Sequence, residues 1–202
     1  MDNPSQPLTK ILVARAQLVT ALDLFLRDKD PISVQCLACG GGEIIEALAE
    51  AHGEEPLAMH ILKTQPRLDR WAIRKLRNQY WNAFKHVSDH KGLAREDEEL
   101  LGRFDDTKND AALFVGWWDY MTLQKRLPVS VQVFQVWWYA LNEEKLSGLA
   151  DVGVVRSAFP DIRQQPRAEQ KRRLRRSIEK WRANRELLAD PATEVALSWD
   201  RR

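Results

Sequence analysis

Apolar residues recur at helical spacing through most of this 202-residue chain, and this periodicity is the strongest constraint on its fold. The clearest case is a segment that begins near Leu68 and ends near Asp89. Its apolar stripe consists of Ile73, Leu76, Tyr80, Ala83 with Phe84, and Val87. These positions fall on one face of a helix with 3.6 residues per turn. No segment alternates apolar and polar residues over a useful strand length, so the sequence predicts an all-α helical bundle.

Capping and turn residues divide the chain into successive helices. Thr9 is a suitable cap for a first helix that ends near Arg27, and Asp30 for a second helix that starts at Pro31. Gly53 can take the left-handed conformation that ends the second helix. Further helical segments are expected over residues 54–67, 68–89, 96–101, 105–125 and 166–188.

The second predicted helix contains Cys36, Cys39 and the run 40–42 of three glycines. Glycine inside a helix costs up to about 1 kcal/mol relative to alanine, so we interpret the run as small residues that permit close helix packing. A phosphate-binding loop would need a preceding strand and a following Lys-Ser or Lys-Thr. For the two cysteines we favour core packing over half of a zinc site or a redox pair.

The pattern Phe-x-x-Trp-Trp occurs at 114–118 and again, 20 residues later, at 134–138. Leu127-Pro128 interrupts the chain between the two copies, which predicts a helical hairpin whose aromatic faces pack together. Because adjacent residues on a helix point about 100° apart, one Trp of each pair is a candidate for stacking or partner contact.

Polar residues gather on the face opposite the apolar stripe of the segment 68–89. They are Asn78, Asn82, Lys85, His86 and Asp89. In a catalytic interpretation His86 is a general acid or base, Lys85 stabilises charge and Asn82 orients the substrate. A metal site built from His86, Asp89 and His90 is a second interpretation, and a hydrogen-bonded polar face or dimer interface is a third. We expect no metal ion or other cofactor, and we leave open whether the protein is an enzyme.

The positive charge of the chain is concentrated near its C-terminus. Residues 163–187 carry ten Lys and Arg against three Glu, a net charge of +7, whereas the whole chain carries only +2. We therefore expect a bundle over residues 1–160 and a basic C-terminal helix with its tail over 161–202. The candidate nucleic-acid-binding residues are Arg172, Arg173, Arg175, Arg176 and Lys180.

The same basic helix has two other interpretations. It could bind an acidic protein partner, or it could dock on the bundle with its charges facing water. Its apolar stripe for docking would be Leu174, Ile178, Trp181 and Leu188. The first ten residues are polar, no apolar run approaches the roughly 18 residues of a membrane span, and there are two Cys. We therefore expect a cytoplasmic protein with no disulfide and no membrane partner.

Several stretches within residues 8–145 resemble an uncharacterised bacterial all-helical family. They are an N-terminal amphipathic helix, Asp30-Pro31-Ile-Ser-Val before a small-residue helix, Asn82-Ala-Phe-Lys85-His86-Val-Ser-Asp89, and a Trp-bearing helix before a Pro. The Asn-x-Phe-Lys-His-x-x-Asp stretch is the most specific of them. This resemblance supports the all-α fold and draws attention to the polar cluster.

A looser resemblance is to HEPN domains, all-α proteins that often act as metal-independent ribonucleases. Their motif is Arg, a polar residue and then His after four to six positions. Here Arg77-Asn78 supplies the start, and His86 follows with eight residues between Arg77 and His86. The resemblance implies a HEPN-like bundle that uses Arg77 and His86, which a homodimer or a kink in the helix could bring together. With the polar cluster described above, the candidate catalytic residues are Arg77, Asn82, Lys85, His86 and Asp89. Two functions result: a nucleic-acid-associated or protein-interaction module of bacterial or phage origin, or a metal-independent ribonuclease that uses Arg77 and His86.

Overall fold

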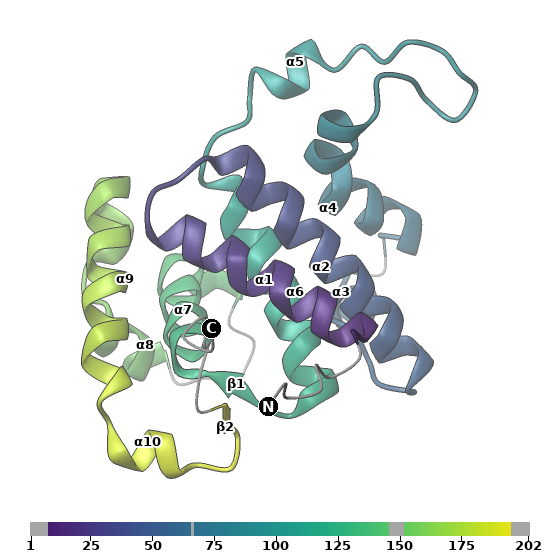
Figure 1. Ribbon diagram of the computed structural model, residues 1–202. Helices are drawn as coiled ribbons and strands as arrows, with labels where there is room; N and C mark the ends of the chain where they lie inside the picture. Colours follow the sequence, from purple (N-terminus) through teal and green to yellow (C-terminus); the bar gives the residue numbers. More distant parts are fainter. Residues whose placement is uncertain (1–7, 66, 146–151, 195–202) are drawn as a thin grey trace, which may run out of the picture. The chain divides into compact units, whose positions relative to one another are not determined.

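The computed structural model describes residues 8–65, 67–145 and 152–194, and within them the fold is all-α, as predicted (Figure 1). The helices are α1 (Lys10–Leu26), α2 (Pro31–Ala51), α3 (Leu57–Thr64), α4 (Arg70–Lys85), α5 (Glu98–Leu101), α6 (Lys108–Gln124), α7 (Val129–Leu141), α8 (Val152–Ala158), α9 (Arg167–Arg182) and α10 (Arg185–Ala189). Two short turns of tighter helix are η1 (Glu143–Lys145) and η2 (Ile162–Gln164). The contacts group the chain into two compact units, residues 1–123 and 124–202. The domain division expected at residue 160 stays a prediction.

The caps predicted for the first two helices are confirmed. The Thr9 hydroxyl accepts a hydrogen bond from the Leu12 N–H, and the Asp30 carboxylate accepts from the Ser33 N–H at 2.9 Å. These bonds satisfy N–H groups that the first turn of a helix leaves unpaired. Pro31 opens α2, and Gly53 follows its end with a φ of +74°.

The glycines of α2 allow the close helix packing that the sequence predicts. α1 and α2 pack along each other in the first unit (Figure 1). A Cβ atom at Gly41 would lie 2.9 Å from the backbone oxygen of Ala14, and one at Gly42 would lie 3.5 Å from the Cα of Gly116 on α6. The α2 backbone therefore approaches both neighbouring helices with almost no side chain between them.

Length and composition alone would let α2 span a membrane, since its most apolar window has a mean hydropathy of 1.3. The buried core helix of a folded domain meets the same criteria, and α2 has the contacts of such a helix on α1 and α4. Both its cysteines are free thiols, Cys39 is buried, and burial raises the pKa of the Cys39 thiol to about 12. The core interpretation of Cys39 fits this placement.

Our expectation about which face of α4 lies in the core is wrong. Leu76 is 67% exposed, whereas Asn78, expected on the solvent side, is only 4% exposed. The helix also ends at Lys85, four residues before Asp89, and leaves Val87 91% exposed. The physical reason lies in the side chains that α2 offers to α4, which are described with the candidate site below.

Aromatic contacts pack the segment that follows α4 against that helix. Phe104 packs against Tyr80 and Phe84, with ring centroids 5.1 and 4.9 Å apart. Of the expected apolar stripe, Tyr80 is the member that is buried, at 7% exposure. The helical turn predicted over 96–101 is present as α5.

In the second unit α9 packs on α7, and the two-residue strands β1 (Leu127–Pro128) and β2 (Thr193–Glu194) pair in parallel. Leu174 and Ile178 of α9 are buried, as the predicted stripe requires. The indole N–H of Trp137 on α7 donates to the backbone oxygen of Gln170 at 3.2 Å. These contacts hold α9 in one orientation about its axis.

One expectation for the second unit is wrong. The basic helix does not run unbroken from residue 166 to 188: α9 ends at Arg182, and the Asn184 side chain caps α10 by accepting from the Leu187 N–H. Asn is among the best N-cap residues, so a second helix starts there. A short helix, α8, comes before α9 in this unit.

The two Trp pairs are mostly interior. Trp117 and Trp137 are fully buried, Trp138 is 8% exposed and Trp118 is half-buried. The idea that one Trp of each pair is exposed for stacking is therefore wrong for Trp138. The contact between the two aromatic faces stays a prediction.

Substitutions at Gly40 and Gly41 should change stability in opposite directions. A methyl group at Gly40 meets only the Gln17 side chain at 3.5 Å, so Gly40→Ala should stabilise the fold by up to about 1 kcal/mol through helix propensity. At Gly41 the methyl collides with the α1 backbone, and overpacking of about 1–3 kcal/mol outweighs that gain. Urea melts of both variants test this, and equal stabilisation by the two would contradict the close packing.

The orientation of α4 can be tested with one exposed and one buried residue. Leu76→Asp should change the free energy of unfolding by no more than about 0.5 kcal/mol, because its side chain lies in water. Tyr80→Ala should cost about 3 kcal/mol or more, as large aromatic truncations do. A larger loss at Leu76 than at Tyr80 in thermal melts would reverse the orientation described above.

Candidate functional site

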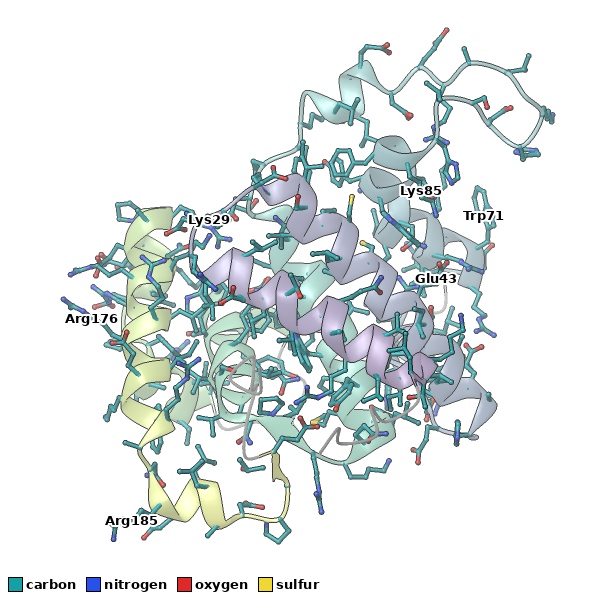
Figure 2. All side chains as sticks on the ribbon, in the orientation of Figure 1. Lys29, Glu43, Trp71, Lys85, Arg176 and Arg185 are labelled. Carbon is teal, nitrogen blue, oxygen red and sulfur yellow. The ribbon has the colours of Figure 1, made fainter. Side chains whose placement is uncertain are left out.

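Charged side chains join α2 to α4. The glutamates of α2 are spaced i, i+3, i+7 and the arginines of α4 are spaced i, i+4, i+7, so each set follows one face of its helix. The pairs are Arg70 with Glu50, Arg74 with Glu43 at 2.7 Å, and Arg77 with Glu46 at 2.5 Å. With Ala47, Ala58, Trp71 and Ile73 they line a groove of about 470 Å³. Figure 2 labels Glu43 and Trp71.

These pairs explain why α4 turns its arginines and Asn78 toward α2. A leucine facing Glu46, whose side chain is only 15% exposed, would leave a largely buried carboxylate without a partner, which costs more than exposing one leucine. Arg77 and Glu46 are the most protected pair, with side chains 13% and 15% exposed. Arg77 also donates from its Nε to the Oδ1 of Asn78 at 3.3 Å. Arg77 thus joins α4 to α2 through Glu46.

A buried carboxylate lies near this pair. Asp119 of α6 has no solvent exposure, and its Oδ1 accepts from the Leu57 N–H at the start of α3 at 2.7 Å. Among the residues that the structure describes, its Oδ2 has no hydrogen-bond partner. Burial, with a smaller contribution from Glu46, raises the pKa of Asp119 to about 7, against the opposing effects of the Leu57 N–H and Arg77.

The other candidate catalytic residues lie at or beyond the C-terminal end of α4. Lys85 is exposed and sits over the Trp81 ring, with its Nζ 3.5 Å from the centroid (Figure 2). His86 is the C-cap, with an extended backbone and an exposed side chain. Asn82 is half-buried, and its backbone oxygen accepts from the His86 N–H.

Asp89 has a structural role in a tight loop. Its Oδ1 accepts from the N–H groups of Lys91 and Leu93, at 2.8 and 3.0 Å. These backbone donors lower the pKa of the carboxyl. Gly92 supplies the positive φ that the loop needs, +78°. The same bonds leave Asp89 poorly placed to act on a substrate.

The structure does not bring Arg77 together with the rest of the proposed catalytic set. Arg77 is tied to Glu46, whereas His86 lies nine residues further on, roughly 13 Å along the helix axis. Asn82, Lys85 and His86 are neighbours in sequence, but no hydrogen bond joins their side chains among the described residues. The described residues also contain no cluster of three or more His, Cys, Asp or Glu side chains suited to a metal ion.

The candidate nucleic-acid-binding residues lie on α9, which carries eight Lys and Arg against two Glu. Arg172, Arg176 and Lys180 recur every four residues, so they share one face, opposite the buried side chains of Leu174 and Ile178. All three are exposed. Figure 2 shows Arg176 on the side of α9 that faces away from α7.

Glu169 neutralises part of this surface. Its two oxygens accept from the Nε of Arg172 at 2.5 Å and the Nε of Arg173 at 2.9 Å. These two arginines lower the pKa of Glu169 to about 2. Arg173 also donates to the backbone oxygen of Pro160 at 2.8 Å, so it is a structural residue as well, and Arg175 is half-buried.

A groove of about 510 Å³ opens between α8 and α9, and we call it the α8–α9 groove. It is lined by Val154, Ser157, Ala158, Arg176, Ser177, Lys180 and Trp181. Trp181, expected in the docking stripe, is 37% exposed. Within the described chain Arg176 forms no ion pair or hydrogen bond.

Sequence reasoning missed the glutamates of α2, Arg70, Arg74, Asp119 and the residues that α8 contributes to the groove. The spacing of the acids on α2 and of the arginines on α4 is visible in the sequence and could have indicated the pairing. No signal in the sequence marks Asp119, because its burial depends on the packing of α3 against α6.

Comparisons with known proteins give no relative for this chain: no family model matches it, and neither the curated proteins nor the solved structures contain a match. The candidate sites therefore depend on their geometry and chemistry alone.

The raised pKa of Asp119 gives a test of its environment. Asp119→Asn keeps an oxygen for the Leu57 N–H but cannot ionise. The wild type should lose stability relative to this variant as the pH rises from about 4, near the ordinary aspartate pKa, to about 7, and the difference should stay constant above that. The change in the stability difference over this pH range should be a few kcal/mol at most. Thermal melts across this range measure it, and a difference that does not change with pH would contradict the buried, unpaired carboxylate.

Proposed function

We propose that the protein binds nucleic acid through the exposed basic face of α9. The observation that supports this most directly is the row of Arg172, Arg176 and Lys180, exposed on a helix whose opposite face is fixed in the second unit. A helix of 16 residues is about 24 Å long, enough to follow several phosphates of a strand. The affinity would come from released counterions, with little dependence on base sequence.

Four further expectations from the sequence are part of this proposal. A HEPN-like arrangement of the helices, a homodimer, a bacterial or phage origin and a cytoplasmic location all remain proposals. A metal-independent ribonuclease is the alternative function. Since Arg77 is paired with Glu46 and lies far along the helix from His86, such an activity would need an Arg and a His from two copies of the chain.

An acidic protein is the other partner that a basic helix would suit. Nucleic acid is the better proposal, because a polyanion with evenly spaced charges matches a row of cations that repeats every turn. The serine and tryptophan side chains beside that row add contacts that nucleic acid can use.

The test compares two charge-reversed variants of the full chain. Reversal of Arg172, Arg176 and Lys180 to Glu should weaken binding to labelled RNA or DNA by roughly tenfold or more at low salt. It should also lower the slope of log K against log salt by about 2–3. The measurement is fluorescence anisotropy over a range of salt concentrations.

The matched control reverses the exposed residues Lys10, Arg67 and Lys91 of the first unit to Glu, which changes the net charge by the same amount. This control should bind nearly as tightly as the wild type. Equal weakening in both variants would mean that net charge, and not the face of α9, determines binding, which would contradict the proposal. A wild type that binds no oligonucleotide at low salt would also refute it.

A further inference from the structure

The α8–α9 groove places cations beside an exposed aromatic ring. Arg176 and Lys180 line it together with Trp181, and all three come from α9. The Lys180 Nζ lies 5.5 Å from the centroid of the Trp181 ring. Val154 of α8 is 61% exposed and extends the apolar surface next to that ring. Trp181 is 37% exposed, so part of its ring is open to a ligand.

We propose that the α8–α9 groove holds one unpaired nucleotide of a single-stranded nucleic acid, with its base stacked on Trp181 and a phosphate on Arg176 and Lys180. This inference rests on the proposed function and adds to it a preference for unpaired bases. Proteins that bind single strands combine a positively charged track with aromatic rings on which bases stack.

The dimensions and polar groups of the groove suit such an occupant. Its volume of about 510 Å³ falls within the roughly 300–1,000 Å³ of small-ligand pockets. The hydroxyls of Ser157 and Ser177, one on each helix, can donate to a phosphate or accept from a base or sugar. Every base presents a flat face to Trp181, so this contact does not select a sequence.

Duplex nucleic acid would use the same cations but not the ring. A base inside a duplex already stacks on its neighbours and reaches a protein side chain only after it has been unpaired, which costs energy. A duplex should therefore bind through Arg172, Arg176 and Lys180 alone. The contribution of Trp181 is the quantity that separates an unpaired strand from a duplex.

The experiment measures anisotropy of a short labelled DNA in three forms: an unpaired strand, the same strand without bases, and a duplex. Trp181→Leu keeps an apolar side chain but removes the stacking surface. It should weaken binding of the unpaired strand by roughly 5- to 150-fold, the range expected for loss of one base stack, and Trp181→Phe should lose much less. Binding of the abasic strand and of the duplex should not change.

Trp71→Leu is the matched control. Trp71 lies in the first unit and is 68% exposed, so this substitution makes the same chemical change at an exposed position outside the groove. It should bind all three forms like the wild type, and thermal melts should show every variant folded. Unchanged binding of the unpaired strand in Trp181→Leu would overturn the groove as a nucleotide site while the charged face of α9 stands.

Two further results separate the remaining explanations. If polyglutamate bound with an affinity that also depended on Trp181, the groove would be assigned to an acidic protein and the nucleotide would be rejected. If the wild type bound no form of the DNA at low salt, the proposed function itself would fail, and the groove inference with it.

Discussion

The close approach of α1 to α2 determines how the rest of the first unit is arranged. At Gly41 a single methyl group would collide with the backbone oxygen of Ala14, so this side of α2 can face nothing but α1. The three glutamates of α2 lie about 140–200° around the helix from Gly41. A helix that covered this side of α2 with leucines would leave the largely buried carboxylate of Glu46 unpaired. α4 therefore meets these glutamates with arginines.

This dependence explains what could be read from the sequence and what could not. Thr9, Asp30 and Gly53 act within a few residues of their own helix, and their roles were predicted correctly. The face that α4 buries depends on glutamates of α2 that lie 31 residues earlier in the sequence. Hydrophobic periodicity counts the apolar residues of one helix only, so it placed Leu76 inside and Asn78 outside, the reverse of what is found.

The candidate sites divide in the same way. The basic residues of α9 and its buried Leu174 and Ile178 were evident from composition and period. The exposure of Trp181 was not evident from the sequence. Trp181 lies near the end of α9, which stops at Arg182 before the Asn184 cap. For the polar cluster of α4, nearness in sequence was mistaken for nearness in space: Asp89 shapes a loop that only forms once the helix has ended.

The carboxylates around an arginine decide whether it serves structure or a partner, and the two arginine-bearing helices differ in this respect. On α4 three arginines meet three glutamates of α2, so their charge is already compensated when a ligand arrives. On α9 eight cations accompany two glutamates, and Glu169 pairs with Arg172 and Arg173. A phosphate that binds near Arg176 displaces mobile counterions, whereas one that binds near Arg77 would have to displace Glu46. Counterion release is the cheaper exchange, and it favours α9 over α4 as the surface for the polyanion that we propose.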